Sequence, residues 1–70
     1  MNKEMKWSLA AARVNKGLTL KEVSDITGLS KDTVYKVESG KSDPRYSTLC
    51  KLCRLYEVGL DDIFIPSITA

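Results

Sequence analysis

Four polar side chains in the middle of the chain could make directed hydrogen bonds from a single surface. They are Lys31, Asp32, Tyr35 and Lys36. If this segment is helical, the spacing places all four on one exposed face. Lysine and tyrosine side chains donate hydrogen bonds, and an ionised aspartate accepts them. The set suits recognition of another polar molecule, although an ordinary solvated helix face has the same composition.

Cys50 and Cys53 form a C-x-x-C pair, a spacing that occurs in zinc sites and in redox proteins. A structural zinc site needs four ligands, and this chain has no histidine and no further cysteine. The pair also falls in the middle of an expected helix, whereas thiolates are activated at helix starts. We therefore expect two small buried apolar side chains, with no metal and no cofactor.

The other requirements of an active site are missing from the sequence. We find no nucleophile paired with a base and no glycine-rich loop that could hold a phosphate. Asp61 and Asp62 are the one cluster of carboxylates, and their place in the first turn of a short helix explains them. The expected protein is not an enzyme.

Length and composition restrict the class of protein. The chain has 70 residues, enough for one small domain, which we assign to residues 1–70. Its apolar fraction of 43% is ordinary for a folded protein, and its net charge of +2 does not by itself indicate a partner. No apolar run is long enough for a membrane span, and the start MNKEMK lacks the apolar core of a signal peptide. We therefore expect a cytoplasmic protein with no membrane partner.

Two short helices joined by a turn are predicted over residues 19–40. Thr19 and Glu22 have the spacing of a capping box, in which each side chain satisfies a free backbone amide. Ser30 supplies the cap of the second helix. Gly28 lies between the two helices, where a positive φ is needed.

The apolar residues of this segment recur at helical spacing, so they are expected to converge on one side. They are Val23, Ile26, Leu29, Val34 and Val37. The polar face described above then points outward from the second helix, which ends at Gly40. This arrangement is a helix-turn-helix.

Three further helices are predicted around this pair. A first helix runs from about Lys6 to Asn15, a fourth from Arg45 or Tyr46 to Glu57, and a last short one covers LDDIF from Leu60. The expected fold is therefore all-α, with five helices and no strand. Its core spans about residues 6–64, followed by an exposed apolar tail over residues 65–70.

The chain resembles the lambda-repressor-like, Cro/Xre-type helix-turn-helix family over about residues 6–64. The resemblance rests on Arg13 and on the runs GLTLKEVSDITGLSKDTVYKVESGKSDP and LCKLCRLYEVGLDDIF. It implies a compact all-α DNA-binding domain. It also implies that the second helix of the pair enters the major groove, with its N-terminal half against the base edges.

Carried over position by position, the resemblance assigns base contacts to Lys31, Asp32, Tyr35 and Lys36. Lysine can donate to guanine O6 and N7, and aspartate can accept from the cytosine amino group. Tyr35 could stack on a thymine methyl group or donate to a phosphate. The alternative remains that the four side chains only solvate the helix.

Backbone contacts are implied on both sides of this helix. Ser30 and Thr33 carry hydroxyl groups that could reach a phosphate, although Ser30 is needed as a cap in any case. Lys41 and Arg45 occupy positions where the family contacts the DNA backbone or the minor groove; for Arg45 the alternative is a plain surface arginine.

The resemblance implies two further features, an ion pair and a changed phosphate contact. Arg13 and Glu38 are expected to form a partly buried structural ion pair between the first helix and the recognition helix. Leu20 stands where many relatives carry a glutamine that touches a phosphate. Because leucine cannot make that bond, the contact is expected either to be lost or to move to Lys21.

We therefore predict a sequence-specific DNA-binding transcriptional regulator, acting as a repressor on a palindromic operator. A homodimer is expected, with contacts through Phe64, Ile65 and Ile68; the alternative is that this tail folds back over the core of its own monomer. The partner is double-stranded DNA, and no small-molecule substrate is expected. The alternative function is a protein-interaction module on the same scaffold, in an antitoxin-like or bridging role.

Overall fold

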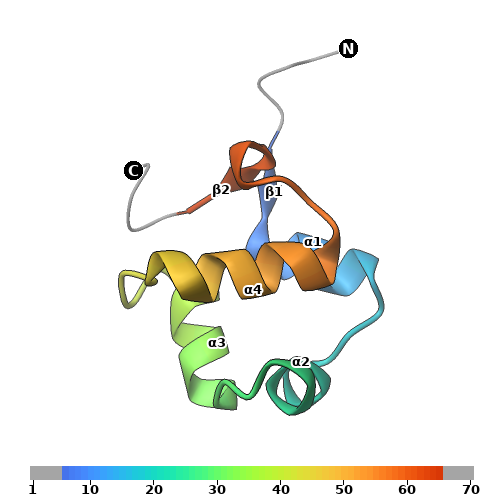
Figure 1. The fold of residues 1–70 in the computed structure, drawn as a ribbon, viewed down its shortest axis with the longest axis vertical. Coiled ribbons are helices and arrows are strands. Elements are labelled where there is room, and N and C mark those ends of the chain that lie inside the picture. Colours follow the sequence, from blue (N-terminus) through green and yellow to red (C-terminus); the bar gives the residue numbers. More distant parts are fainter. Residues whose placement is uncertain (1–5, 66–70) are drawn as a thin grey trace.

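The computed structural model describes residues 6–65 of the chain. These residues form four α-helices, one turn of 3₁₀ helix and two short strands (Figure 1). In chain order the elements are β1 (Trp7–Ser8), α1 (Leu9–Asn15), α2 (Leu20–Thr27), α3 (Lys31–Ser39), α4 (Tyr46–Tyr56), η1 (Leu60–Asp62) and β2 (Ile63–Phe64). The predicted all-α fold class is confirmed, while the predicted number of helices differs by one.

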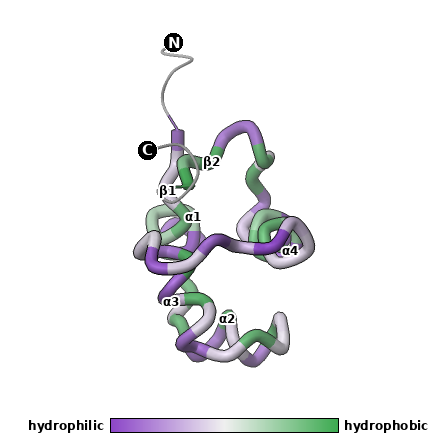
Figure 2. The backbone as a smooth tube through the Cα atoms, turned by 90° about the vertical axis from the view of Figure 1, so that its left-hand side faces the viewer, coloured by the Kyte–Doolittle hydropathy of each residue, from purple (hydrophilic) through white to green (hydrophobic). Residues whose placement is uncertain are grey.

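The helices form two levels. Turned by 90°, the structure shows α1 and α4 side by side above α3 and α2 (Figure 2). The contacts agree with this view, since α1 packs against α4 and α2 packs against α3. Hence α2 and α3 lie at one end of the molecule, with the two strands at the other (Figure 1).

The first helix starts later than predicted. Ser8 has an extended backbone and its Oγ accepts a hydrogen bond of 3.0 Å from the amide of Ala11, so it caps a helix that begins at Leu9. Trp7 and Ser8 instead form β1, which pairs in parallel with β2. The prediction that the chain has no strand is therefore wrong.

The predicted fifth helix is only a single turn. The amide of Asp62 donates to the carbonyl of Gly59 at 2.9 Å, and the backbone becomes extended at Ile63, with φ −111° and ψ 136°. Ile63 is buried and pairs in register with Trp7. Pairing with a distant segment therefore overrides the local preference for a helix.

The core lies between the two levels of helices and under the strands. Its buried residues are Leu9, Ala12, Val23, Val34, Val37, Leu49, Leu52, Cys53, Tyr56, Ile63 and Ile65. Ile26 does not belong to it, because its side chain is 60% exposed. On α2 the inward stripe runs through Leu20, Val23, Ser24 and Thr27, and Ile26 lies beside this stripe.

All four α-helices are followed by a residue with a positive φ, and α1, α3 and α4 share the same pair of hydrogen bonds in this turn. In these three turns the residue with the positive φ is Gly17 after α1, Gly40 after α3 and Glu57 after α4. At the end of α4, the amide of Val58 donates to the carbonyl of Cys53 at 3.0 Å and the amide of Glu57 donates to the carbonyl of Arg54 at 3.2 Å. These two bonds define a Schellman motif, in which glycine is the favoured residue.

Replacing Glu57 with glycine is expected to stabilise the domain, because Glu57 holds φ at 59°, where a Cβ atom is disfavoured. We expect the midpoint of thermal unfolding to rise by about 4 °C. Glu57→Ala is the matched control: it removes the same ion pair with Lys16 but keeps the strained backbone. Equal midpoints for the glycine and alanine variants would contradict the prediction.

Candidate functional site

The helix-turn-helix begins with the predicted capping box. The hydroxyl of Thr19 accepts a hydrogen bond of 3.1 Å from the amide of Glu22, and the Glu22 carboxylate accepts one of 2.8 Å from the amide of Thr19. Helix α2 then ends at Gly28, whose φ is 81°. These local interactions set the turn that leads into α3.

Ser30 starts α3 as its cap. Its Oγ accepts a hydrogen bond of 3.0 Å from the amide of Thr33, and its hydroxyl donates one of 2.8 Å to the Thr33 hydroxyl. The capping role of Ser30 is therefore present. Thr33 is half-buried beside it, and its expected contact with a phosphate stays a prediction.

Helix α3 separates an apolar face from a polar one. Val34 and Val37 are buried against the rest of the domain, at 0% and 2% exposure. The four residues assigned to base contacts are all exposed; they are Lys31, Asp32, Tyr35 and Lys36. The structure thus brings the predicted set together on one surface of α3.

An ion pair lies within this surface. The ammonium group of Lys36 is 3.1 Å from a carboxylate oxygen of Asp32, one helical turn earlier. Both side chains are largely exposed, so the pair adds little to stability. It nevertheless orients a hydrogen-bond donor and an acceptor next to each other, which the sequence reasoning did not anticipate.

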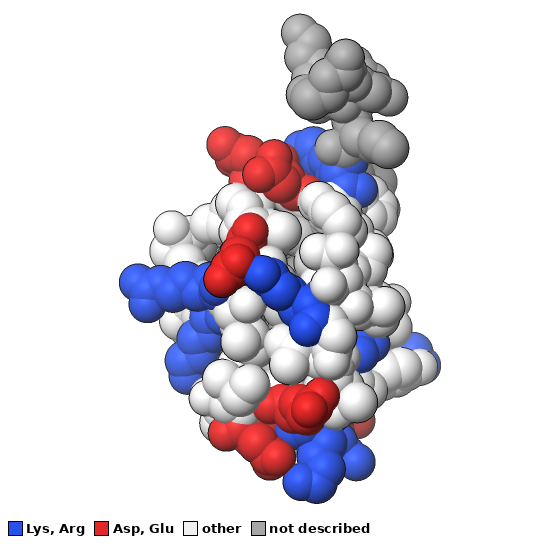
Figure 3. Space-filling model, turned by 90° about the vertical axis from the view of Figure 1, so that its right-hand side faces the viewer, with Lys and Arg blue, Asp and Glu red and all other residues white. Residues whose placement is uncertain are grey.

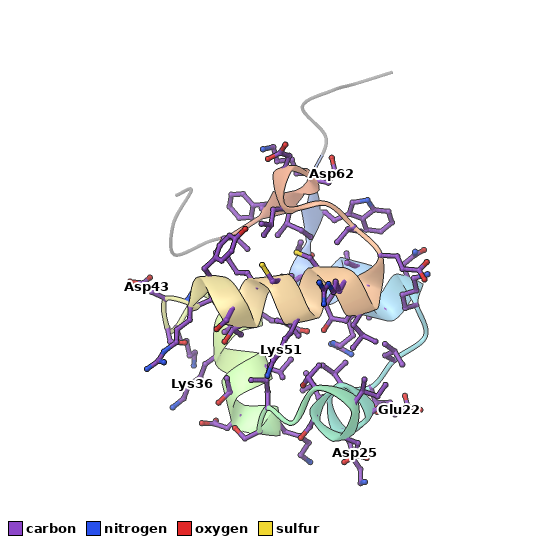
Figure 4. The ribbon with its side chains drawn as sticks, in the orientation of Figure 1. Glu22, Asp25, Lys36, Asp43, Lys51 and Asp62 are labelled. Carbon is purple, nitrogen blue, oxygen red and sulfur yellow. The ribbon has the colours of Figure 1, made fainter. Side chains whose placement is uncertain are left out.

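The segment after α3 carries two further cations. Lys41 follows Gly40 and places its ammonium group 5.6 Å from the centre of the Tyr35 ring. Arg45 is exposed and immediately precedes α4, with no hydrogen bond from its side chain to the helix start. Lys36 and Asp43 both lie on the side of the molecule formed by α3 and this segment (Figure 4). Asp43 is the acidic member of the segment, and sequence reasoning did not include it.

The charges on α2 differ from those on α3. Glu22 and Asp25 mark its exposed side (Figure 4). The ammonium group of Lys21 is 3.1 Å from a carboxylate oxygen of Asp25, and both side chains are exposed. Lys21 is therefore engaged within α2, and its expected phosphate contact stays a prediction.

Away from α3, the surface is mixed in charge. The face in Figure 3, which views the molecule from the side opposite α3, shows acidic and basic side chains next to one another. Lys16, which follows α1, and Glu57, which follows α4, form an ion pair that lowers the pKa of the Glu57 carboxyl group. This face therefore offers no continuous basic surface for a polyanion.

Arg13 and Glu38 connect α1 to α3, as the resemblance implied. The Nε atom of Arg13 donates to one carboxylate oxygen of Glu38 at 2.7 Å, and Nη2 donates to the other at 3.3 Å. Nη1 of Arg13 donates to the carbonyl of Leu18 at 2.8 Å, so the same side chain also binds the segment before α2. The bond to Glu38 raises the pKa of Arg13. One guanidinium group therefore joins three parts of the domain, namely α1, the segment before α2 and α3.

Tyr56 lies in the core close to this ion pair. Its side chain is 1% exposed, and its hydroxyl has no hydrogen-bond partner among residues 6–65. Burial raises the pKa of Tyr56 to about 12, and the charge of Glu38 acts in the same direction. The helical stripe of α4 predicts that Tyr56 points inward, but nothing in the sequence indicates an unpaired hydroxyl group.

The two cysteines have the environment of structural residues. Cys53 is buried and Cys50 is half-buried in the middle of α4. Burial raises the pKa of the Cys53 thiol, and Cys50 adds to this shift. Within residues 6–65 no three histidine, cysteine or acidic side chains come together in a way that could hold a metal ion.

The residues predicted to form a dimer contact differ in exposure. Phe64 is 40% exposed at the end of β2, whereas Ile65 is 6% exposed and belongs to the core. The expectation that Ile65 is exposed is therefore wrong, because its side chain packs back into its own monomer. Ile68 lies outside the described residues.

None of the helices in the described part is long and apolar enough to span a bilayer.

The chain is similar to known helix-turn-helix proteins. A family model described as helix-turn-helix matches residues 9–63. An uncharacterised HTH-type transcriptional regulator of Methanocaldococcus jannaschii is 33% identical over 61 residues, which cover 87% of this chain and 92% of that protein. No solved structure matches the chain significantly.

Proposed function

Because the chain belongs to the Cro/Xre-type helix-turn-helix family and is a DNA-binding transcriptional regulator, we propose that it represses transcription by reading a palindromic operator as a homodimer. The observation that carries this proposal is the division of α3 into a buried valine face and an exposed polar face. The apolar face fixes the helix to the domain, and the polar face stays free to enter the major groove.

The exposed charged residues of α3 then have defined roles. Lys31 opens the helix and donates to guanine, while Asp32 and Lys36 present an acceptor and a donor as one unit. Backbone phosphates are bound from around α3, and the residues that we assign to them are Lys21, Ser30, Thr33, Lys41 and Arg45. We place the protein in the cytoplasm and assign it no enzymatic activity.

Dimerisation follows from the small size of the surface. A single recognition helix makes too few contacts to select one site among the many competing sites of a genome. Two copies related by a twofold axis would read half-sites about 34 Å apart on one face of the duplex. We place the contact at the end of β2, where Phe64 is partly exposed.

The proposal is tested by selection from a pool of random-sequence duplexes at roughly physiological salt, followed by sequencing of the bound fragments. We expect an inverted repeat whose half-sites are about one helical turn apart. Binding without an enriched sequence, or no binding at all, would overturn the operator proposal. That result would favour the alternative role as a protein-interaction module.

Replacing Lys31 with alanine is expected to weaken binding to the selected operator about tenfold and to relax the preference at one base pair of each half-site. The reason is that a lysine contact to a guanine edge discriminates between bases, whereas a phosphate contact does not. Binding constants on single-substituted operators measure both effects. Lys6→Ala is the matched control, since Lys6 is an exposed lysine at the strand end of the domain. An unchanged base preference would remove Lys31 from the base contacts.

Replacing Phe64 with aspartate is expected to raise the dissociation constant of the dimer by about tenfold or more, because it puts a charge into an apolar contact. Sedimentation velocity over a range of protein concentrations measures this shift. Val14→Asp is the control, since Val14 is an exposed apolar residue of α1 outside the proposed contact. Unchanged sedimentation of the Phe64 variant would place the dimer contact elsewhere.

A further inference from the structure

Lys41 is held in place by an aromatic ring. Its ammonium group lies 5.6 Å from the centre of the Tyr35 ring, within the range of a cation–π interaction. Tyr35 belongs to α3, whereas Lys41 comes after the end of that helix. They meet because the chain reverses direction at Gly40.

The reversal is fixed by the backbone. Gly40 has a φ of 78°, the amide of Lys41 donates to the carbonyl of Lys36 at 2.9 Å, and the amide of Gly40 donates to the carbonyl of Val37 at 3.3 Å. These bonds form a Schellman motif that sets the start of the Lys41 side chain. The rest of that side chain has several rotatable bonds, so a separate contact is needed to direct its ammonium group.

The Tyr35 ring provides this contact without cancelling the charge. Lys36 is paired with Asp32, so its positive charge is partly neutralised on the surface of the free protein. Lys41 forms no ion pair with any described residue, and its neighbour is a neutral ring that is 46% exposed. The full charge of Lys41 therefore remains available to an anion.

We propose that Tyr35 is a positioning residue for Lys41, which it holds beside α3 in the orientation that binds a backbone phosphate. This inference rests on the proposed contact between Lys41 and the DNA backbone. The ring reduces the number of conformations that Lys41 loses on binding, and a preordered side chain binds more tightly than a mobile one. Tyr35 thus contributes to affinity through its face, while its hydroxyl group and any base contact are not required.

A double-mutant cycle on operator binding tests the assignment. We expect Tyr35→Phe to bind like the natural protein, because it keeps the ring, and Tyr35→Leu to lose about fivefold in affinity. In a Lys41→Met background, Tyr35→Leu should cause no further loss, since the residue that it positions is gone. Lys41→Met alone should lower the slope of log affinity against log salt by about one.

Two outcomes would overturn the proposal. If Tyr35→Leu costs as much in the Lys41→Met background as alone, Tyr35 acts on the DNA directly. If Tyr35→Phe loses as much as Tyr35→Leu, the hydroxyl group is the functional part.

A measurement on the free protein separates this inference from the proposed function. The ε-methylene protons of Lys41 should show an upfield ring-current shift by NMR, which Tyr35→Phe keeps and Tyr35→Leu abolishes. Absence of the shift in the natural protein would overturn the positioning role even if the operator is bound. If the shift is present but no duplex is bound, the ring contact stands and the operator proposal fails.

Discussion

Replacing Glu38 with alanine is expected to lower the free energy of unfolding by about 3 kcal/mol. The side chains of Arg13 and Glu38 are only 16% and 7% exposed, so the variant leaves a guanidinium group largely out of water without its counter-ion. In a domain of this size the loss corresponds to a fall of roughly 15 °C in the midpoint of thermal unfolding. Urea denaturation measures this loss. The slope of the unfolding free energy against urea concentration should be the same as in the natural protein.

The double replacement Arg13→Met with Glu38→Leu is the control for this prediction. Apolar residues of similar volume remove both charges at once, so most of the lost stability should return. A loss below about 1 kcal/mol for Glu38→Ala would mean that the pair behaves like an exposed salt bridge. The pair also joins α1 to the recognition helix, so the double variant separates its effect on stability from any effect on operator binding.

Replacing Tyr56 with phenylalanine is expected to raise the free energy of unfolding by about 1 kcal/mol, although the natural residue is fully buried. A buried hydroxyl group without a partner loses its bonds to water on folding, and phenylalanine fills the same space without that cost. Chemical denaturation of the two proteins at neutral pH measures the difference. A loss of stability instead would show that the hydroxyl is satisfied in solution.

The same substitution should change the response to alkaline pH. The pKa of Tyr56 is raised from 10.0 in the unfolded chain to about 12 in the folded protein, because burial disfavours the phenolate. A raised pKa contributes stability that is fully present below pH 10 and is lost as the pH rises through 12. Relative to Tyr56→Phe, the natural protein should therefore lose stability between pH 10 and pH 12. If the free energy of unfolding changes with pH in the same way for both proteins between pH 10 and pH 12, the prediction is wrong.

Local signals in the sequence were sufficient for the helix-turn-helix. The capping box at Thr19 and the serine cap at Ser30 depend on residues three positions apart, and both form as predicted. The separation of α3 into two faces follows from its helical period alone. The pairing of Arg13 with Glu38 came from the family resemblance, because spacing along the chain does not reveal which distant charges meet.

Long-range contacts explain where the structure differs from the predictions made from the sequence. Strand β1 is too short to produce an alternating pattern, and it exists because Trp7 pairs with Ile63. The same pairing brings Ile65 into the core, where the sequence suggested an exposed tail. Ile26 has the right residue type for the core but lies off the buried stripe of α2, which composition cannot reveal.

The parallel pairing of β1 with β2 also has a mechanical consequence. Since the strands run in the same direction, the chain enters the pair at one end, through Trp7, and leaves it at the other, through Phe64. A force that pulls the described ends apart therefore acts along the strands and loads their hydrogen bonds together, in shear. In an antiparallel pair the bonds would instead open one after another. The strands, and not the recognition helix at the far end of the domain, should bear such a load first.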